Sequence, residues 1–396
     1  MPSRRPLLDT TMCNQWCKRF VIASIIAVVL AFVQSAWSAQ TDPIFAGGFE
    51  TFPPASLTVH YPAGAHFITA RGNAGGLSPT QGRTFSRAGD TFTLVLQVNT
   101  AAHWKPLLDD ATYAIGPDYP VAPGERVEIW PHFTTAQGQV VTLIAAFHST
   151  VLGNDRPIYA YLPPTYLENT DATFPVVYMH DGQNLWASLP LLATSATTWQ
   201  VDTAFDAASN SGAFKEAIVI GIPHNASRIY EYTPTTDPQV AGGGGANLYL
   251  QMVAQELKPV VDNMLRTRAG ASSTLMAGSS LGGLVSCYAG RTMPTVFGRI
   301  AALSPSSWWN NEVIVADVLG TPAAPNRPLL VYLDSGDSSD DGVVETNNLA
   351  AAYVSVGYDE GVDLLHLVQA GGLHNETFWA QRFPGAMQFL LGPRDQ

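Results

Sequence analysis

Short apolar runs alternate with longer helical stretches from about residue 140 to the end of the chain. Apolar residues dominate PVVYMHD, EAIVIGI, TLMAGSS, RIAALSPS, PLLVYLDSG and VDLLHLVQAGG, as expected for buried central strands. The segment NLYLQMVAQELKPVVDNMLRTR has apolar residues at helical spacing. This alternation predicts an α/β domain over residues 140–396, in which helices cover both faces of a mostly parallel sheet.

The region before this domain, residues 56–135, has a different pattern. It contains short runs of strand character, SLTVHY, HFITARG, DTFTLVLQV and RVEIW, which turn clusters such as GNAGG and RAGD separate. Short strands at this spacing predict a small antiparallel β-sandwich. Trp104, Tyr113 and Trp130 could stack on sugars there. Packing in the core or against the next domain is the favoured interpretation, because single aromatic side chains are usually buried in a sandwich.

The first 39 residues have the pattern of an export signal. An uncharged apolar run occupies residues 20–33, small residues follow it, and positive charges precede it at Arg4, Arg5, Lys18 and Arg19. We expect cleavage near Ser38 or Ala39, which makes the protein secreted or periplasmic with no stable membrane partner. An uncleaved anchor is the alternative, but the run is short of the roughly 20 residues that a span needs. Residues 40–55 are expected to be a linker.

Composition limits the partners. The formal net charge is −12 and charged residues make up only 13% of the chain. No basic run follows the N-terminal segment, so a phosphate backbone would meet little opposite charge and nucleic acid is excluded as a partner. Cys287 is the one cysteine after residue 39, so the mature chain cannot form an internal disulfide. We expect Cys287 to be a buried, inert thiol.

The segment Gly278–Gly283, GSSLGG, has the form G-x-S-x-G. It follows the apolar run 274–277 and opens a helical segment at Leu284. This strand–turn–helix context is what a nucleophile elbow requires, whereas a short Gly/Ser pattern alone could arise by chance. Ser280 is therefore the predicted nucleophile. The N–H group of Leu281, directly after it, is a predicted oxyanion donor.

A serine nucleophile needs a base, and in this fold the order along the chain is Ser, acid, His. His374 lies in a glycine-rich loop after the last strand, AGGLHNETFW, and is the predicted base. His366 falls inside the strand pattern and is expected to be structural.

The acid should follow the strand PLLVYLDSG. The loop after this strand offers four carboxylates, at Asp334, Asp337, Asp340 and Asp341. Asp334 is expected to belong to the strand end, and the next helix is expected to begin near Val343. Asp341 is the first choice, with Asp340 and Asp337 as alternatives. A solvated turn or a calcium-binding loop is the competing interpretation of these aspartates.

Four segments together resemble one family. VVYMHDGQNLW, IPHNASRIYEYTP, GSSLGGL and GGLHNETFWAQRFPGAMQFL are similar to the esterase family that includes enterochelin esterases, esterase D, feruloyl esterases and the antigen 85 mycolyltransferases. The similarity covers roughly residues 145–392. The elbow is common to all α/β-hydrolases, whereas H-D-G-Q-N and G-G-x-H-x-E-x-x-W are more selective. Residues 56–133 resemble the Ig-like or starch-binding-like modules that precede such domains.

The resemblance implies a Ser–Asp/Glu–His triad that acts on an acyl ester without a metal or other cofactor. Ser280 and His374 match the motif positions of the family. The acid matches less well: family members often place it where this chain has Ser339, so one or two extra loop residues leave Asp340 and Asp341 open. The segment at Asp181 and Gly182, which alone would indicate only a turn, is implied to place the second oxyanion donor at Gln183.

Further residues are predicted to bind substrate. Asp181 lies beside the oxyanion loop. Arg228 lies in a loop that the family uses near its active site, where it could bind an anionic or hydroxyl-rich substrate or form an ion pair with Glu231. Trp308 and Trp309 follow a strand end. Neighbouring tryptophans point to different sides, so we expect one to line the acyl or leaving-group pocket and the other to be in the core.

Taken together, the sequence predicts an exported serine hydrolase that cleaves a carboxylic ester through an acyl-enzyme. Its substrate would be a small-molecule or glycan-linked ester, and siderophore, feruloyl, sugar-linked and simple esters stay open. Acyl transfer to a sugar or alcohol is one alternative. A carbohydrate-binding protein with an inactive hydrolase domain is another, although the intact Ser280 and His374 argue against it.

Overall fold

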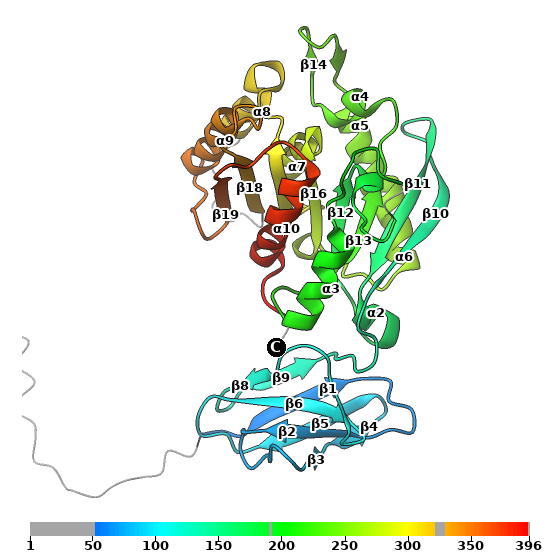
Figure 1. Ribbon diagram of the computed structural model, residues 1–396, viewed down its shortest axis with the longest axis vertical. Helices are drawn as coiled ribbons and strands as arrows, with labels where there is room; N and C mark the ends of the chain where they lie inside the picture. The colour runs from blue at the N-terminus through cyan, green and yellow to red at the C-terminus, as the bar shows by residue number, and fades with distance from the viewer. Residues whose placement is uncertain (1–51, 190–191, 321–328, 395–396) are drawn as a thin grey trace, which may run out of the picture. The chain divides into compact units, whose positions relative to one another are not determined.

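The computed structural model describes residues 52–189, 192–320 and 329–394, so the predicted signal and most of the predicted linker lie outside the described residues. Among the described helices, none is long and apolar enough to cross a bilayer. The remaining chain contains two small β-sheets followed by one large sheet with helices (Figure 1).

The N-terminal region forms two facing sheets. The four-stranded sheet has the order β4 (Ser86–Ala88), β5 (Thr91–Leu96), β1 (Ala55–His60) and β9 (Arg126–Ile129). The five-stranded sheet has the order β3 (Arg83–Thr84), β2 (Ile68–Gly72), β6 (Ala102–Leu108) and β7 (Thr112–Tyr113), and β8 (Tyr119–Val121) also pairs with β6. All pairs are antiparallel except β1 with β9.

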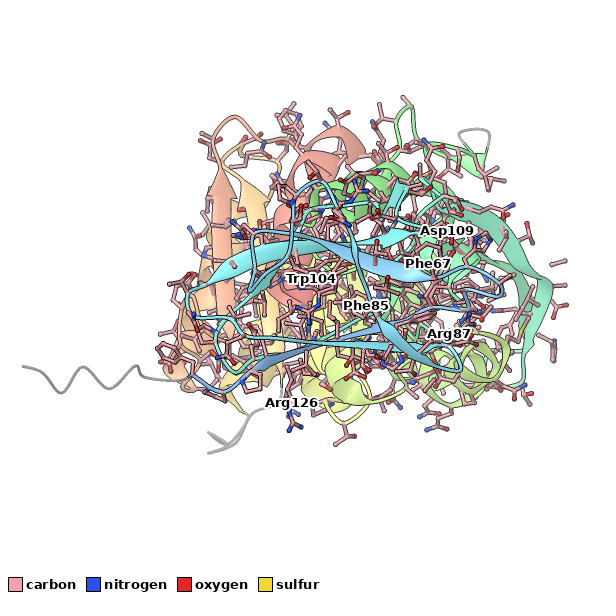
Figure 2. All side chains as sticks on the ribbon, turned by 90° about the horizontal axis from the view of Figure 1, so that it is seen from below. Phe67, Phe85, Arg87, Trp104, Asp109 and Arg126 are labelled. Carbon is pink, nitrogen blue, oxygen red and sulfur yellow. The ribbon has the colours of Figure 1, made fainter. Side chains whose placement is uncertain are left out.

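One hydrophobic core joins the two sheets. Ala55, Leu57 and Val59 alternate inward from β1, which is why this strand begins at the last residue of the predicted linker. Trp104 is fully buried, 5.9 Å from the ring of Phe85. Figure 2 shows both rings lying among the strands of the two sheets, while Arg126 points outward.

The three aromatic residues of this region have different surroundings. Trp104 belongs to the core, as the favoured interpretation predicted. Trp130 is partly buried and stacks on His60, with 4.8 Å between the ring centroids. Tyr113 is exposed and lies 5.7 Å from the guanidinium of Arg71.

The C-terminal region is built on an eight-stranded sheet, and this architecture confirms the predicted α/β-hydrolase fold. The strands β10 and β11 at one edge are antiparallel to their neighbours. The other six strands, β13, β12, β16, β17, β18 and β19, run parallel to one another. In spatial order the strands are β10 (Gln139–Ser149), β11 (Asn154–Leu162), β13 (Ile218–Ile222), β12 (Val176–His180), β16 (Thr274–Ser280), β17 (Arg299–Pro305), β18 (Leu330–Gly336) and β19 (Leu364–Gln369).

The central strands are apolar throughout because both of their faces are covered. Alternate residues of β12 enter two different cores: Val176 and Tyr178 belong to one, and Val177 and Met179 to the other. The second core is closed by α3 (Val201–Ser211) and α10 (Glu376–Leu391), which Figure 1 shows in front of the sheet. The first core is closed by α4 (Arg228–Tyr232), α5 (Ala246–Gln251), α6 (Lys258–Met264), α7 (Leu281–Thr292), α8 (Trp309–Leu319) and α9 (Val343–Ser355).

Smaller elements complete the domain. They are helix α2 (Pro164–Glu168), the single-turn helices η1 (Gly182–Asn184) and η4 (Ala271–Ser273), and the two-stranded sheet of β14 (Thr236–Asp237) and β15 (Gly242–Gly243).

The segment from Asn247 to Arg268, which has apolar residues at helical spacing, is not one continuous α-helix. A π-helical segment, η3 (Met252–Leu257), separates α5 from α6, and α6 ends at Met264. Pro259 follows η3 and has no N–H to donate to the carbonyl four residues earlier, so a regular α-helix cannot pass through this point. The predicted helical character is confirmed as far as Met264.

Candidate active site

The strand ends bring the predicted site residues to one edge of the sheet. β12, β13, β16, β17, β18 and β19 run parallel, so their carboxyl ends meet at the same edge. Ser280 ends β16, Gln183 lies in the turn after β12, and Asp341 and His374 follow β18 and β19. Residues that lie far apart in the sequence therefore converge there.

Ser280 sits on a tight strand-to-helix turn. Its backbone has φ 57° and ψ −125°, a strained conformation for a residue with a side chain and one that functional sites often contain. A Cβ at position 278 would lie 2.8 Å from the His180 ring and 2.9 Å from the backbone of Gly282, so the first glycine of the motif is required by close packing. The Ser280 Oγ lies 3.3 Å from the Oγ of Ser306.

His374 is hydrogen-bonded to one aspartate of the loop after β18. Its Nδ1 lies 2.7 Å from the Oδ1 of Asp341. The His374 ring meets the Trp379 ring edge to face, with 5.1 Å between centroids. These contacts fix the ring plane. An Nδ1–H that donates to Asp341 leaves Nε2 as the proton acceptor.

The Asp341 carboxylate is completely buried and has a partner for each oxygen. Oδ1 faces His374, and Oδ2 accepts from the Ser304 hydroxyl at 2.8 Å and from the N–H of Gly336. Burial alone would raise the pKa of Asp341. The hydrogen bonds from His374, Gly336 and Ser304 outweigh it and hold that pKa below its ordinary value. Asp341 is thus kept as a carboxylate.

The other aspartates of the loop lie elsewhere. Asp334 is buried inside β18, as expected. The Asp337 carboxylate accepts from the N–H of Gly371 at 2.7 Å, and Asp340 is exposed and bonded to the Ser338 hydroxyl. Helix α9 begins at Val343, where the sequence predicted it. Among the described residues there is no group of three or more metal-ligating side chains, so the calcium-loop interpretation is not supported.

The predicted oxyanion donors occupy turns on two neighbouring strands. Leu281 is the first residue of α7, and Gln183 lies in η1, directly after β12. β12 and β16 pair with each other in the sheet. The Gln183 side chain is anchored by His224, whose backbone N–H donates to Gln183 Oε1 at 3.2 Å. This anchor restrains the orientation of the peptide groups in η1.

Asp181 and Arg228 form a bidentate salt bridge beside the oxyanion loop. Arg228 Nε and Nη2 donate to the two Asp181 oxygens at 2.8 Å each, and His224 Nδ1 lies 2.6 Å from Asp181 Oδ1. Burial would raise the pKa of Asp181, but the bonds from Arg228 and His224 depress it well below its ordinary value. Burial would likewise lower the pKa of Arg228, but Asp181 raises it above its usual range.

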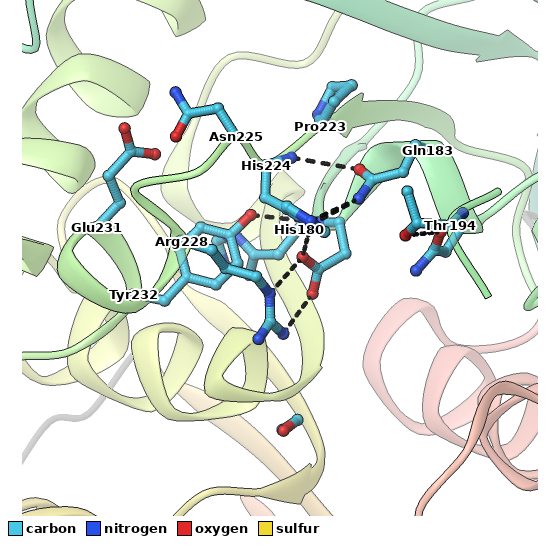
Figure 3. Close-up of polar contacts among 12 residues, drawn as sticks. His180, Gln183, Thr194, Pro223, His224, Asn225, Arg228, Glu231 and Tyr232 are labelled. Atoms are coloured by element: carbon cyan, nitrogen blue, oxygen red, sulfur yellow. Dashed lines mark hydrogen bonds and ion pairs between the residues drawn. The ribbon is translucent and has the colours of Figure 1, made fainter. Parts of the chain in front are cut away.

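The alternative pairing of Arg228 with Glu231 was wrong. Glu231 instead forms a buried ion pair with Arg156 of β11, at 2.8 Å. Figure 3 shows Gln183, His224 and Arg228 converging, while Glu231 lies away from them. The two residues are three positions apart on the short helix α4, yet Arg228 contacts the turn after β12 and Glu231 contacts strand β11.

A cavity of about 400 Å³ opens over Ser280 and His374. Its lining includes the charged or polar side chains of Asp181, Arg228 and His224 and the aromatic side chains of Trp199 and Trp379. Polar groups complete the lining at Asn184, Thr194, Ser195, Ser279 and Glu376. The cavity thus combines aromatic side chains with a few directional polar groups, as small-molecule sites usually do.

One of the two adjacent tryptophans is exposed and the other is in the core, as expected. Trp309, the core residue, is therefore removed from the predicted binding residues. Trp309 is 1% exposed and donates its Nε1–H to the Thr235 carbonyl at 2.9 Å, so it is a core residue and cannot contact a substrate. Trp308 is 46% exposed. It lines a second cavity of about 160 Å³ together with Asp340, Glu345 and His374.

Several residues at the site were not singled out from the sequence. Trp199, His224 and Glu376 line the main cavity, and Ser304 and Arg382 contact the far side of Asp341. Glu376 and Trp379 lie in the motif G-G-x-H-x-E-x-x-W, which could have indicated them. Ser304 and Arg382 are serine and arginine in ordinary strand and helix contexts, where nothing local indicates a role.

Comparison with known proteins identifies the family. Residues 149–390 match the family model described as "Putative esterase". The uncharacterized protein YbbA of Bacillus subtilis is 26% identical over 254 residues, which is 60% of this chain and 93% of that protein. The siderophore enterobactin esterase of Emericella nidulans is 33% identical over 116 residues, and the siderophore triacetylfusarinine C esterase of Aspergillus fumigatus is 31% identical over 147 residues. The first alignment covers 25% of this chain and 38% of the fungal enzyme, and the second covers 36% and 47%, so each spans less than half of either protein.

Solved structures agree on the fold. A ferulic acid esterase aligns with a TM-score of 0.50 and 19% identity, covering 64% of this chain and 98% of that one. The BES protein from Bacillus cereus also aligns with a TM-score of 0.50, at 20% identity over 65% and 96% of the two chains. The chain therefore belongs to this esterase family of α/β-hydrolases and is a carboxylic ester hydrolase.

Proposed function

We propose that the enzyme is an exported serine esterase in which Ser280, His374 and Asp341 form the catalytic triad. The observation that carries this proposal is the 2.7 Å bond between His374 and the buried Asp341, beside a cavity that His374 shares with Ser280. No other carboxylate of the β18 loop contacts His374 among the described residues.

The proposed reaction has two halves. His374 Nε2 takes the proton of the Ser280 hydroxyl as Oγ attacks the ester carbonyl, and the resulting tetrahedral oxyanion accepts hydrogen bonds from the N–H groups of Leu281 and Gln183. The alcohol leaves with the proton that His374 returns, and the acyl group stays on Ser280. Water then attacks the acyl-enzyme, with His374 again as base. Asp341 stays ionised and stabilises the imidazolium in both halves.

We propose an aromatic or hydroxyaromatic carboxylic ester as the substrate class, with siderophore and feruloyl esters as the candidates. Trp199 and Trp379 contribute aromatic side chains to the lining of the main cavity, and Arg228 and Asn184 contribute polar groups. Two similar fungal proteins are siderophore esterases and a similar solved structure is a ferulic acid esterase, which supports the same substrate class. The N-terminal pattern of residues 1–39 supports the proposed export.

A substrate panel tests this function. The purified enzyme is assayed on enterobactin, methyl ferulate and p-nitrophenyl acetate, with Ser280→Ala as the matched control. We expect kcat/KM for at least one aromatic ester to exceed that for the acetate, and Ser280→Ala to lose all three activities. A preference for acetate over both aromatic esters would contradict the proposed substrate class. Full activity of Ser280→Ala would contradict the mechanism.

A further inference from the structure

Arg382, in the middle of α10, contacts the far side of the triad. Its side chain is 6% exposed. Nε forms an ion pair with Asp334 Oδ1 at 3.0 Å, and Nη1 donates to Gln369 Oε1 at 2.9 Å. Nη2 donates to the Ser304 hydroxyl at 2.6 Å and lies 3.5 Å from Asp341 Oδ2. The guanidinium therefore joins the buried Asp334 to the buried Asp341.

The Ser304 hydroxyl between these groups donates one hydrogen bond and accepts two, so its proton and both of its lone pairs are used. It donates to Asp341 Oδ2 at 2.8 Å, and it accepts from Arg382 Nη2 and from Trp379 Nε1, the latter at 3.0 Å. A hydroxyl has one proton to donate and two lone pairs, so two donors on the oxygen force its proton toward Asp341. Ser304 also has a positive φ of 42°, which the surrounding contacts must hold in place.

The charges in this cluster are unequal. Asp334 and Asp341 are both completely buried, and Arg382 is the one cation with an ion pair to each of them among the described residues. Burial, the strongest influence, raises the pKa of Asp334 to about 7 even though Arg382 opposes the shift. Asp341, in contrast, keeps a lowered pKa. Burying Asp334 in addition to Asp341 is costly. A structural ion pair between Arg382 and one carboxylate would not require a second buried carboxylate.

The geometry points to Arg382 as a positioning residue for Asp341, with Asp334 as the counter-ion that holds the guanidinium in place. Arg382 fixes Oδ2 directly and through Ser304, so that Oδ1 is the oxygen that faces His374. This inference rests on the proposed triad. Arg382 lines neither of the two cavities that His374 lines, so it acts through Asp341 and touches no substrate.

The test uses Arg382→Gln, Arg382→Lys and the double variant Arg382→Gln/Asp334→Asn in the full-length enzyme. Active sites are counted by labelling with a fluorophosphonate, and kcat on p-nitrophenyl acetate is expressed per labelled site. We expect Arg382→Gln to lower kcat about 10- to 100-fold with KM unchanged, because misplacing a catalytic group by about 1 Å can cost about 100-fold. Arg382→Lys keeps the charge and should regain part of kcat.

The double variant separates positioning from stability. Arg382→Gln alone removes the cation that opposes the raised pKa of Asp334, so Asp334 must either stay charged without its partner or take up a proton, and both are destabilising. Adding Asp334→Asn replaces this buried acid by a neutral amide, so the melting temperature should recover while kcat per labelled site stays low. Recovery of parent-level kcat in the double variant would overturn the inference, because Arg382 would then serve only to neutralise Asp334.

Arg156→Gln is the matched control, since Arg156 also forms a buried ion pair, with Glu231. It should lower the melting temperature without the large loss of kcat per labelled site. An equal loss of kcat in this control would also overturn the inference. If the parent enzyme is not labelled at Ser280, the proposed function itself fails. This result differs from a double variant that is labelled at Ser280 and has parent-level kcat, which overturns only the role of Arg382.

Discussion

Replacing Asp341 by asparagine tests the triad through its hydrogen-bond geometry. Oδ2 of Asp341 accepts from the Ser304 hydroxyl and the Gly336 N–H, so the amide oxygen of the introduced asparagine must take that place. The amide NH₂ then faces His374 Nδ1 and can only donate to it. His374 would have to carry its proton on Nε2, where it can no longer accept the proton of Ser280.

The expected loss follows from this wrong tautomer. Loss of the orienting carboxylate in a serine triad lowers kcat by about 10⁴-fold, which corresponds to about 5.5 kcal/mol of transition-state stabilisation. The assay is kcat/KM on p-nitrophenyl acetate at pH 7.5, with circular dichroism to verify the fold.

Two neighbouring variants are the controls. Asp337→Asn and Asp340→Asn should stay within about threefold of the parent enzyme, because both side chains lie near the surface and neither contacts His374. Asp341→Asn activity within tenfold of the parent, or a larger loss in Asp340→Asn, would refute the assignment of Asp341 as the acid.

Three other predictions follow from the same contacts. Gly278→Ala should disrupt the elbow and lower kcat/KM by about 100-fold or more, because its Cβ would meet the His180 ring and the Gly282 backbone; Gly385→Ala in α10, where a Cβ meets nothing within 4 Å, should keep parent-level activity. Arg228→Gln should lower the free energy of unfolding, measured in urea titrations, most near neutral pH. The difference from the parent should shrink as the pH falls below about 4, because the depressed pKa of Asp181 stabilises the fold only above the pKa of the unfolded-state carboxyl. Trp308→Ala should raise KM for methyl ferulate or enterobactin several-fold and leave p-nitrophenyl acetate unaffected, whereas Trp309→Ala should cost about 3–5 kcal/mol of folding free energy.

The central strands and the elbow could be predicted from sequence because their signals are local. A strand covered on both faces must be apolar throughout, and the tight turn at Ser280 must have glycine beside the His180 ring. The order Ser, acid, His along the chain then limited the base to the histidines after Ser280. The π-helical segment before Pro259 could not be predicted, because the spacing of apolar residues does not register a missing N–H donor.

The ion pairs could not be predicted because they depend on contacts between distant segments. Glu231 lies three residues from Arg228, and spacing on a helix favours their pairing. In the fold, Arg228 meets Asp181, 47 residues away, and Glu231 meets Arg156, 75 residues away. Likewise the loop spacing left three aspartates as candidates for the acid. The choice among them depends on how the β18 and β19 loops meet, as does the contact of Arg382 with Asp341.

Stoichiometric labelling of the enzyme tests the central claim most directly. The purified protein is incubated with a fluorophosphonate, and its intact mass and proteolytic peptides are measured alongside those of Ser280→Ala. We expect one adduct per chain, located on the peptide that contains Ser280, with loss of ester hydrolysis in proportion to labelling and no adduct in the alanine variant. An adduct on another residue, or hydrolysis that persists after complete labelling of Ser280, would contradict the proposed triad.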